Sequence, residues 1–264
     1  MVFNNCDFIS QIRLRQLSCL TYCVLQMTDF YNINGRIKSL LDDTIIAQYA
    51  HIRQLDASLG CIHDVNNLTE LRKLNTQSSQ INQKGIDKLK YVRILFADRH
   101  NARITNVNHL QDLRILYATH QSGIDQAGIA DLRKLIILYA RSNSKITSVN
   151  HLTELRKLFA DNTCGIDQTG ILKLCKLETL TVQDNPRIVC VNHLTELLAL
   201  RANYGSGIDQ TGIASLRKLV DLYAVGNNKI TDIRHLSQLA MFNGAIINVT
   251  NKIKYNNYML VRLF

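Results

Sequence analysis

The chain has 264 residues, 46% of them hydrophobic, with 31 Lys and Arg against 21 Asp and Glu, a formal net charge of +10. The hydrophobic content allows a continuous core, but no apolar run reaches the roughly 18 residues of a membrane-spanning helix. The first ten residues lack the features of a secretory signal, and the seven cysteines contain no Cys-x-x-Cys pair. These features predict an intracellular, cytoplasmic protein with reduced thiols.

Residues 1–40 do not follow the pattern of the rest of the chain. Leu14, Leu17 and Leu20 form at most one degenerate copy of that pattern. In repeat arrays, the terminal units cover the open ends of the core. We therefore expect residues 1–40 to form an N-terminal cap or a degenerate repeat, with no catalytic module.

Residues 41–245 carry an internal repeat of 42 residues, built from two related passages that alternate in steps of 20 and 22 residues. Isoleucines open the shorter passage at Ile104, Ile146, Ile188 and Ile230, and the longer one at Ile124, Ile166 and Ile208. Both contain the kernel Leu-x-x-Leu-x-x-Leu-x-Ala, as in Leu152, Leu155, Leu158 and Ala160. A period of this size predicts a solenoid of about ten stacked units whose leucines and isoleucines point inward.

The kernel resembles the leucine-rich repeat family. The resemblance implies an α/β repeat solenoid, a horseshoe or arc with a parallel β-sheet on its concave face and short helices or 3₁₀ turns on its convex face. It places a strand at residues 158–160. It also implies that an asparagine three residues after the kernel alanine or valine bonds to the turn. The longer units have this residue and the shorter units do not; the positions are Asn143, Asn185 and Asn227, against Gln121, Thr163 and Gly205.

The segment between the opening isoleucine and the kernel differs between the two kinds of unit. Longer units insert Asp-Gln-x-Gly-Ile, where Asp125, Asp167 and Asp209 are suitable helix N-caps. We expect a short helix there and a 3₁₀ turn in the shorter units. Residues 246–264 should form a C-terminal cap.

The strand position before the kernel alanine is the strongest candidate for function. Four consecutive units place an aromatic residue there, at Phe96, Tyr117, Tyr139 and Phe159. Strand alternation turns this position to solvent, and exposed aromatic side chains are favoured anchors in protein interfaces. The same face should extend over Arg141, Asp161, Arg201 and Tyr223. The alternative is that the rings only pack on one another across the sheet.

A second column is basic. Arg103, Lys145, Arg187 and Lys229 each precede the isoleucine of a shorter unit. With the net charge of +10, this column makes binding of nucleic acid or another polyanion the alternative function. Solvated charges on a solenoid flank need no ligand, however.

No pattern predicts a metal or a catalytic site. His109, His151, His193 and His235 recur two units apart, about 10 Å, too far for one zinc ion. Cys190 and His193 lie three residues apart, but the matching units have no cysteine. We therefore predict a non-enzymatic scaffold that binds a protein or peptide on its concave sheet, with no cofactor, metal, membrane or small-molecule substrate.

Overall fold

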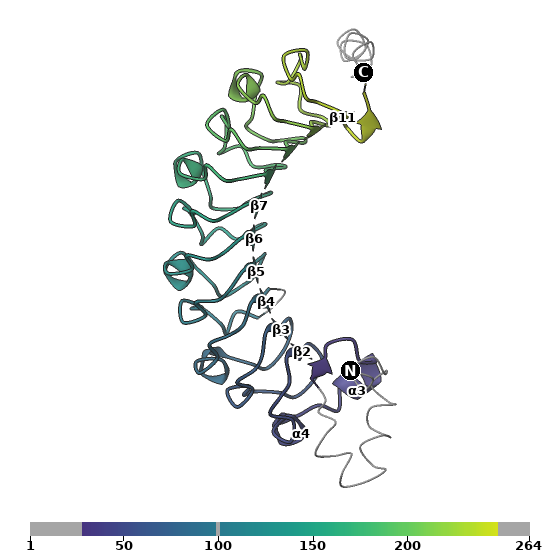
Figure 1. Ribbon diagram of the computed structural model, residues 1–264, viewed down its shortest axis with the longest axis vertical. Coiled ribbons are helices and arrows are strands. Elements are labelled where there is room, and N and C mark those ends of the chain that lie inside the picture. The colour runs from purple at the N-terminus through teal and green to yellow at the C-terminus, as the bar shows by residue number, and fades with distance from the viewer. Residues whose placement is uncertain (1–27, 99–100, 248–264) are drawn as a thin grey trace. The chain divides into compact units, whose positions relative to one another are not determined.

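The computed structural model describes residues 28–98 and 101–247. The chain divides into two compact halves, Met1–Leu132 and Arg133–Phe264. In each half, short parallel strands lie side by side along one side of the coils, and the 3₁₀ helices lie on the opposite side (Figure 1). The expected strand at 158–160 is observed one residue earlier, at Lys157–Phe159.

The N-terminal half contains a parallel ladder in which each strand pairs with the next along the chain. Its strands are β1 Asp29–Phe30, β2 Gln54–Asp56, β3 Lys73–Asn75, β4 Ile94–Phe96 and β5 Ile115–Tyr117. Its helices are α3 Gly35–Lys38, α4 Asp43–Ile46 and the 3₁₀ helices η2 Gln83–Gly85 and η3 Ala127–Ile129.

The C-terminal half continues in the same manner and ends on an antiparallel pair, β11 with β12. Its strands are β6 Ile137–Tyr139, β7 Lys157–Phe159, β8 Thr179–Thr181, β9 Ala199–Arg201, β10 Asp221–Tyr223, β11 Met241–Phe242 and β12 Ala245–Ile246. Its 3₁₀ helices are η4 Thr169–Ile171 and η5 Thr211–Ile213.

The core consists of the residues that the repeat predicts. The opening isoleucines, the kernel leucines and the kernel alanines are buried in both halves. Leu158 and Ala160, for example, are fully buried, as is Ile146 at the start of their unit. The apolar side chains of each coil pack against those of the coils before and after it. The stacking of coils therefore forms one continuous core.

The helical prediction needs a correction. The longer units carry a single 3₁₀ turn where we expected a short helix, and the shorter units have a hydrogen-bonded turn with no helix. The predicted caps are nevertheless present, since Asp167 Oδ1 accepts a hydrogen bond from Gly170 N at 3.0 Å. Gly170 holds the turn against the preceding coil, where a Cβ atom would lie 2.4 Å from the carbonyl oxygen of Thr147. The coils are therefore too close for a longer helix.

The turns after the strands alternate between two kinds. Asn143, Asn185 and Asn227 are buried, as the resemblance implied for the longer units, and Asn101, four residues after Ala97, is buried too. Asn185 Nδ2 donates to the carbonyl oxygens of Ala160 and Ile166, and its Oδ1 accepts from Arg187 N. In the shorter units the buried residue stands one position later than predicted, at Ser122, Cys164 and Ser206, while Gln121, Thr163 and Gly205 are exposed.

Side-chain amides on the helical side join successive coils. Gln168 Oε1 accepts hydrogen bonds from the backbone N–H groups of Val189 and Cys190, and its Nε2 donates to Cys190 O. Gln83, about two blocks earlier, and Gln210, one block later, make the same contacts. These amides satisfy backbone groups that the turns leave unpaired.

Most of the two predicted caps lies outside the described residues, which omit 1–27 and 248–264. In the described part, β1 joins the sheet as an additional parallel strand beside β2, and β12 folds back on β11. The boundaries at residues 40 and 246 remain predictions.

Candidate functional site

The first and third residues of each strand point away from the core, and we call the surface that they form the outer sheet face. The middle residue of each strand is buried, as Leu95 and Leu158 are, so the flanking residues must face outward. Parallel pairing in register then places equivalent residues of successive strands beside one another, for example Tyr139 beside Phe159.

In the N-terminal half, Phe96 and Tyr117 stack face to face, with ring centroids 4.2 Å apart and an interplanar angle of 16°. Both rings are part-exposed, and so are Ile94 and Ile115 at the first positions of the same strands. Tyr31, which follows β1, lies 6.2 Å from the Phe96 ring. The face therefore presents a continuous apolar strip over β4 and β5.

In the C-terminal half, Tyr139 and Phe159 form a second stack, with centroids 4.1 Å apart and an angle of 7°. Beside them, the Arg141 guanidinium donates two hydrogen bonds to Asp161 Oδ2, at 3.0 and 2.9 Å. Asp161 is 2% exposed and also accepts from Gln183 N. Of this ion pair, Arg141 is the member that solvent can reach.

Further along the same face, the Arg201 guanidinium lies over the Tyr223 ring, 5.0 Å from its centroid. The predicted partner-binding residues thus all lie on the outer sheet face or in the turn directly after it. Phe96 and Tyr117 belong to the N-terminal half, and the other six belong to the C-terminal half.

Strand alternation predicted that the third strand position faces solvent in every unit. This is not the case in three units. Asp56 and Asn75 are buried at the start of the array, and Thr181 is buried on β8. Lys38 from α3 forms an ion pair with Asp56. Burial raises the pKa of Asp56, but the hydrogen bonds from Lys38 and Ser58 outweigh it and leave the pKa below its ordinary value. This end of the face is closed by residues outside the repeat.

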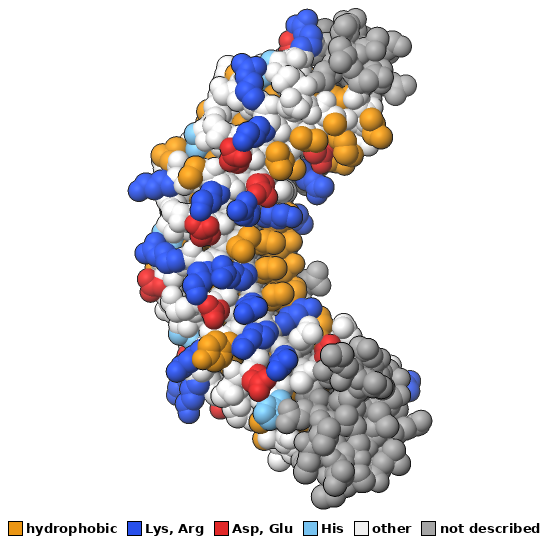
Figure 2. All heavy atoms as spheres, in the orientation of Figure 1, with side chains coloured by type: hydrophobic (Ala, Val, Ile, Leu, Met, Phe, Trp, Pro, Cys, Tyr) orange, Lys and Arg blue, Asp and Glu red, His pale blue; other side chains and the backbone are white. Residues whose placement is uncertain are grey.

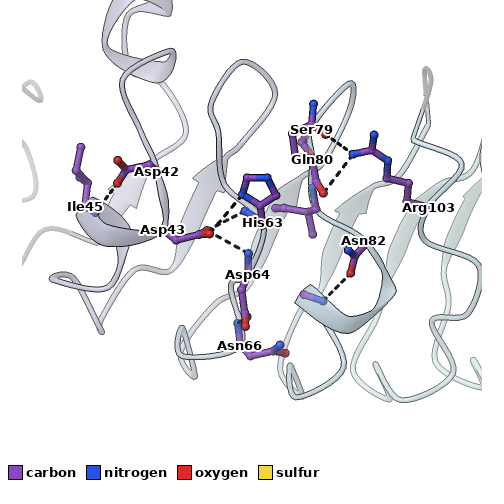
Figure 3. A network of polar contacts seen from close by, with 12 residues as sticks. Asp42, Asp43, Ile45, His63, Asp64, Asn66, Ser79, Gln80, Asn82 and Arg103 are labelled. Atoms are coloured by element: carbon purple, nitrogen blue, oxygen red, sulfur yellow. Dashed lines mark hydrogen bonds and ion pairs between the residues drawn. The ribbon is translucent and has the colours of Figure 1, made fainter.

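The basic column lies in the turns, apart from the outer sheet face. Arg103 reaches back to Gln80 in the preceding coil (Figure 3). Arg187 Nη1 donates to Gly165 O at 3.4 Å and Lys229 Nζ to Ser206 O at 3.1 Å. All three of these residues are exposed, and so is Lys145.

Acidic side chains accompany much of the positive charge. Figure 2 shows basic side chains interspersed with acidic ones on the visible flank of the coils. Lys176 pairs with Glu154 and Lys218 with Glu196, each at 2.6 Å. Ion pairs across successive coils therefore offset positive charge locally on this flank, while the net charge of +10 is unchanged.

The histidine column has a structural contact. The Nε2–H groups of His109, His193 and His235 donate to the carbonyl oxygens of Ile86, Ile171 and Ile213, at 3.0, 3.2 and 3.3 Å. His193 is thus bonded to backbone. Among the described residues, no three His, Cys, Asp or Glu side chains converge in a group that could hold a metal ion.

Sequence reasoning missed Asp221 and Thr181. Their Oδ1 and Oγ1 atoms are buried and have no hydrogen-bond partner, alone among the side chains of residues 28–98 and 101–247. Asp221 did carry a signal, because it is the one acidic residue at the first strand position of any repeat unit. Thr181 carried none.

No protein-family model and no curated protein sequence matches this chain. Solved structures do match it. A leucine-rich-repeat protein of Leptospira interrogans is 16% identical over 92% of this chain and 85% of its own, with a TM-score of 0.50. This chain has the leucine-rich-repeat fold.

Two further leucine-rich-repeat matches come from Listeria monocytogenes. An internalin, InlF, is 19% identical over 84% of this chain and 78% of its own, with a TM-score of 0.43. The functional domain of InlJ is 16% identical over 74% of this chain, which spans 49% of that domain, with a TM-score of 0.48. Within the described part of this leucine-rich-repeat chain, no helix has the length and apolar character needed to cross a bilayer.

Proposed function

We propose that this chain is a non-enzymatic scaffold whose outer sheet face binds a protein partner, with the stacked aromatic pairs as anchors. The stacked pairs carry the proposal, because each keeps its rings part-exposed on a face where the fold needs no aromatic residue. Repeat solenoids commonly use such extended faces for binding.

An aromatic pair at this position contributes more free energy to binding a partner than to the stability of the sheet. A cross-strand aromatic pair contributes about 0.2–1 kcal/mol to sheet stability. An aromatic anchor buried in an interface contributes about 2 kcal/mol or more to binding. Part-exposed isoleucines beside the rings, Ile94, Ile115 and Ile137, widen the apolar surface that a partner can cover.

The test is capture of partners from a lysate of the source organism on the immobilised full chain, with quantification by mass spectrometry. Two variants remove one stack each: Phe96→Ser with Tyr117→Ser, and Tyr139→Ser with Phe159→Ser. Matched controls replace exposed tyrosines outside the strands, Tyr91→Ser and Tyr204→Ser. Circular dichroism checks that every variant is folded.

At least one stack variant should lose proteins that both controls retain, by about thirtyfold or more in affinity. Retention of every partner by both stack variants would remove the outer sheet face from consideration. Binding of duplex DNA that disappears in Arg187→Gln with Lys229→Gln, and falls steeply with added salt, would favour the polyanion alternative instead.

A further inference from the structure

The two unpartnered polar atoms lie on one surface. Thr181 belongs to β8 and Asp221 to β10, with β9 between them. Two strand spacings across the sheet and two residues along the strands place the two positions about 12 Å apart. Buried polar atoms in folded proteins nearly always have partners, so two orphans on one exposed face call for an explanation.

The surroundings of Asp221 are mostly apolar. Its neighbours in the ladder are Ala199 on β9 and Met241 on β11, and Tyr223 follows on the same face. Burial raises the pKa of its carboxyl, and Arg201 opposes that shift. The Arg201 guanidinium, however, lies over the Tyr223 ring and forms no hydrogen bond with Asp221 Oδ1.

Two exposed apolar residues lie next to the strands at this carboxyl, and we call them the apolar edge. Leu198 and Val220, directly before β9 and β10, are 42% and 39% exposed. Val220 N bonds to Leu198 O, so the two residues are adjacent. The two preceding repeat units place Arg156 and Glu178 at the same position, paired with each other. The units of β9 and β10 therefore carry aliphatic surface, beside an unpaired acid, where the two preceding units carry an ion pair.

On the β8 and β9 side of Asp221, the first strand positions carry small side chains, whereas Arg201 occupies the third position of β9, beside Thr181. Thr179 and Ala199 occupy the first positions of β8 and β9, between the larger Lys157 and Asp221. An extended chain laid across the strands could approach the sheet closely here, and it would reach the carboxyl and the apolar edge together.

We propose that β8–β10 bind an extended basic segment of a protein partner, with a Lys or Arg side chain on the Asp221 carboxylate and apolar side chains on Leu198 and Val220. This proposal rests on the proposed function and specifies the chemistry of the partner. The net charge of +10 does not oppose it, because salt screens charges beyond about 8–10 Å while the contact itself is direct.

The probe is a phage-displayed library of random linear peptides, selected against the immobilised full chain. Selected peptides should share a Lys or Arg next to apolar residues. Asp221→Asn should weaken them about ten- to a hundredfold, as expected for a lost hydrogen bond between charged groups. The matched control is Asp232→Asn, whose carboxyl pairs with Arg234 away from the sheet face and should leave binding unchanged.

Two more variants sharpen the result. Arg201→Gln removes a competing cation and should tighten binding of the basic peptides several-fold. Thr181→Val keeps the shape of the side chain and tests the second orphan; a loss of affinity greater than about threefold, with unchanged stability, would assign the hydroxyl to the same site. If Thr181→Val leaves affinity unchanged, the Asp221 contact alone defines the site.

Other outcomes overturn the proposal. Selected peptides without a basic residue, or with equal affinity for Asp221→Asn, would exclude the ion pair, and loss of binding in the Tyr139 and Phe159 variant would then leave the proposed function standing. If neither the library nor the lysate yields a ligand sensitive to any sheet-face variant, both proposals fail.

Discussion

The side-chain amide of Asn185 donates a hydrogen bond to the carbonyl oxygen of Ala160, one coil earlier, at 2.8 Å. The same nitrogen reaches Ile166 O at 3.2 Å, and the amide oxygen accepts from Arg187 N at 2.9 Å. One buried side chain thus satisfies three backbone groups at the place where two coils meet. Since each coil depends on its neighbours, such contacts contribute to the stability of the array as a whole.

Asn185→Ala should therefore destabilise the protein by about 2–4 kcal/mol, because it leaves buried backbone groups without partners. Urea unfolding followed by circular dichroism measures the change. Asn228, an exposed neighbour, provides the control, and Asn228→Ala should change the free energy of unfolding by less than about 0.5 kcal/mol. Equal effects of the two substitutions would contradict a structural role for the buried amide.

Gln168 offers a graded test of the contacts on the helical side. Gln168→Ala should cost about 1–2 kcal/mol, because three hydrogen bonds to Val189 and Cys190 are lost at a partly exposed site. Gln168→Glu keeps an acceptor for the two N–H groups and loses only the donor to Cys190 O. It should cost about half as much, again measured by urea unfolding.

The exposed Gln238 serves as the comparison for this series. Gln238→Ala should be neutral. If Gln168→Glu were as harmful as Gln168→Ala, the two accepted hydrogen bonds would contribute nothing, and the amide would act only through its donor.

The sequence predicted the strands and the core because both follow from periodicity alone. Leu158 is buried since its spacing from Leu155 and Leu152 repeats in each unit, whatever the turns do. The turn residues were predicted less well. The turns of Ser122 and Asn143 have the same length, but Ser122 N bonds to Thr119 O, one residue after the kernel alanine, whereas Asn143 N bonds to the kernel alanine Ala140 itself.

Contacts between coils were not predictable in the same way. Gln168 bonds to residues one unit later in the chain, and the sequence of its own unit does not predict that contact. At the candidate site, the aromatic column was predicted from strand alternation, and the stacking of Tyr139 on Phe159 agrees with it. The burial of Asp56 was not predicted, because it depends on Lys38 from outside the repeat.

Tyr204 has a left-handed backbone conformation, with φ of 51°. The equivalent residues in neighbouring coils are Asn162, Asp184 and Gly226, which tolerate this conformation better than a tyrosine does. Tyr204→Asn should therefore stabilise the fold by about 1 kcal/mol, seen as a higher urea midpoint. Val225→Asn, a substitution at an exposed residue outside the left-handed region, should give no gain.

A second substitution separates strain from contact. A Cβ atom at Gly226 would lie 2.9 Å from Cδ1 of Tyr204, and Gly226 itself has φ of 69°. Gly226→Ala should be destabilising in the native chain and less so in the Tyr204→Asn background, where only the backbone strain remains. Additive effects would show that the Tyr204 ring does not restrict Gly226.

Cys164 makes stability depend on pH in the alkaline range. Burial raises the pKa of its thiol from 9.0 to about 11. Below pH 9 the thiol is neutral in both the folded and the unfolded chain. Between pH 9 and 11 the unfolded chain releases the proton while the folded chain retains it, so stability falls as the pH rises. At pH 10 this loss amounts to about 1.4 kcal/mol.

Cys164→Ser isolates this contribution, because serine occupies the equivalent buried position in two other turns, Ser122 and Ser206. The variant should unfold at nearly the native urea midpoint at neutral pH and should lose less stability than the native chain between pH 9 and 10.5. Comparing the two proteins at each pH cancels the titration of lysines and tyrosines that they share. Parallel pH profiles would mean that the thiol ionises in the folded state as readily as in the unfolded chain.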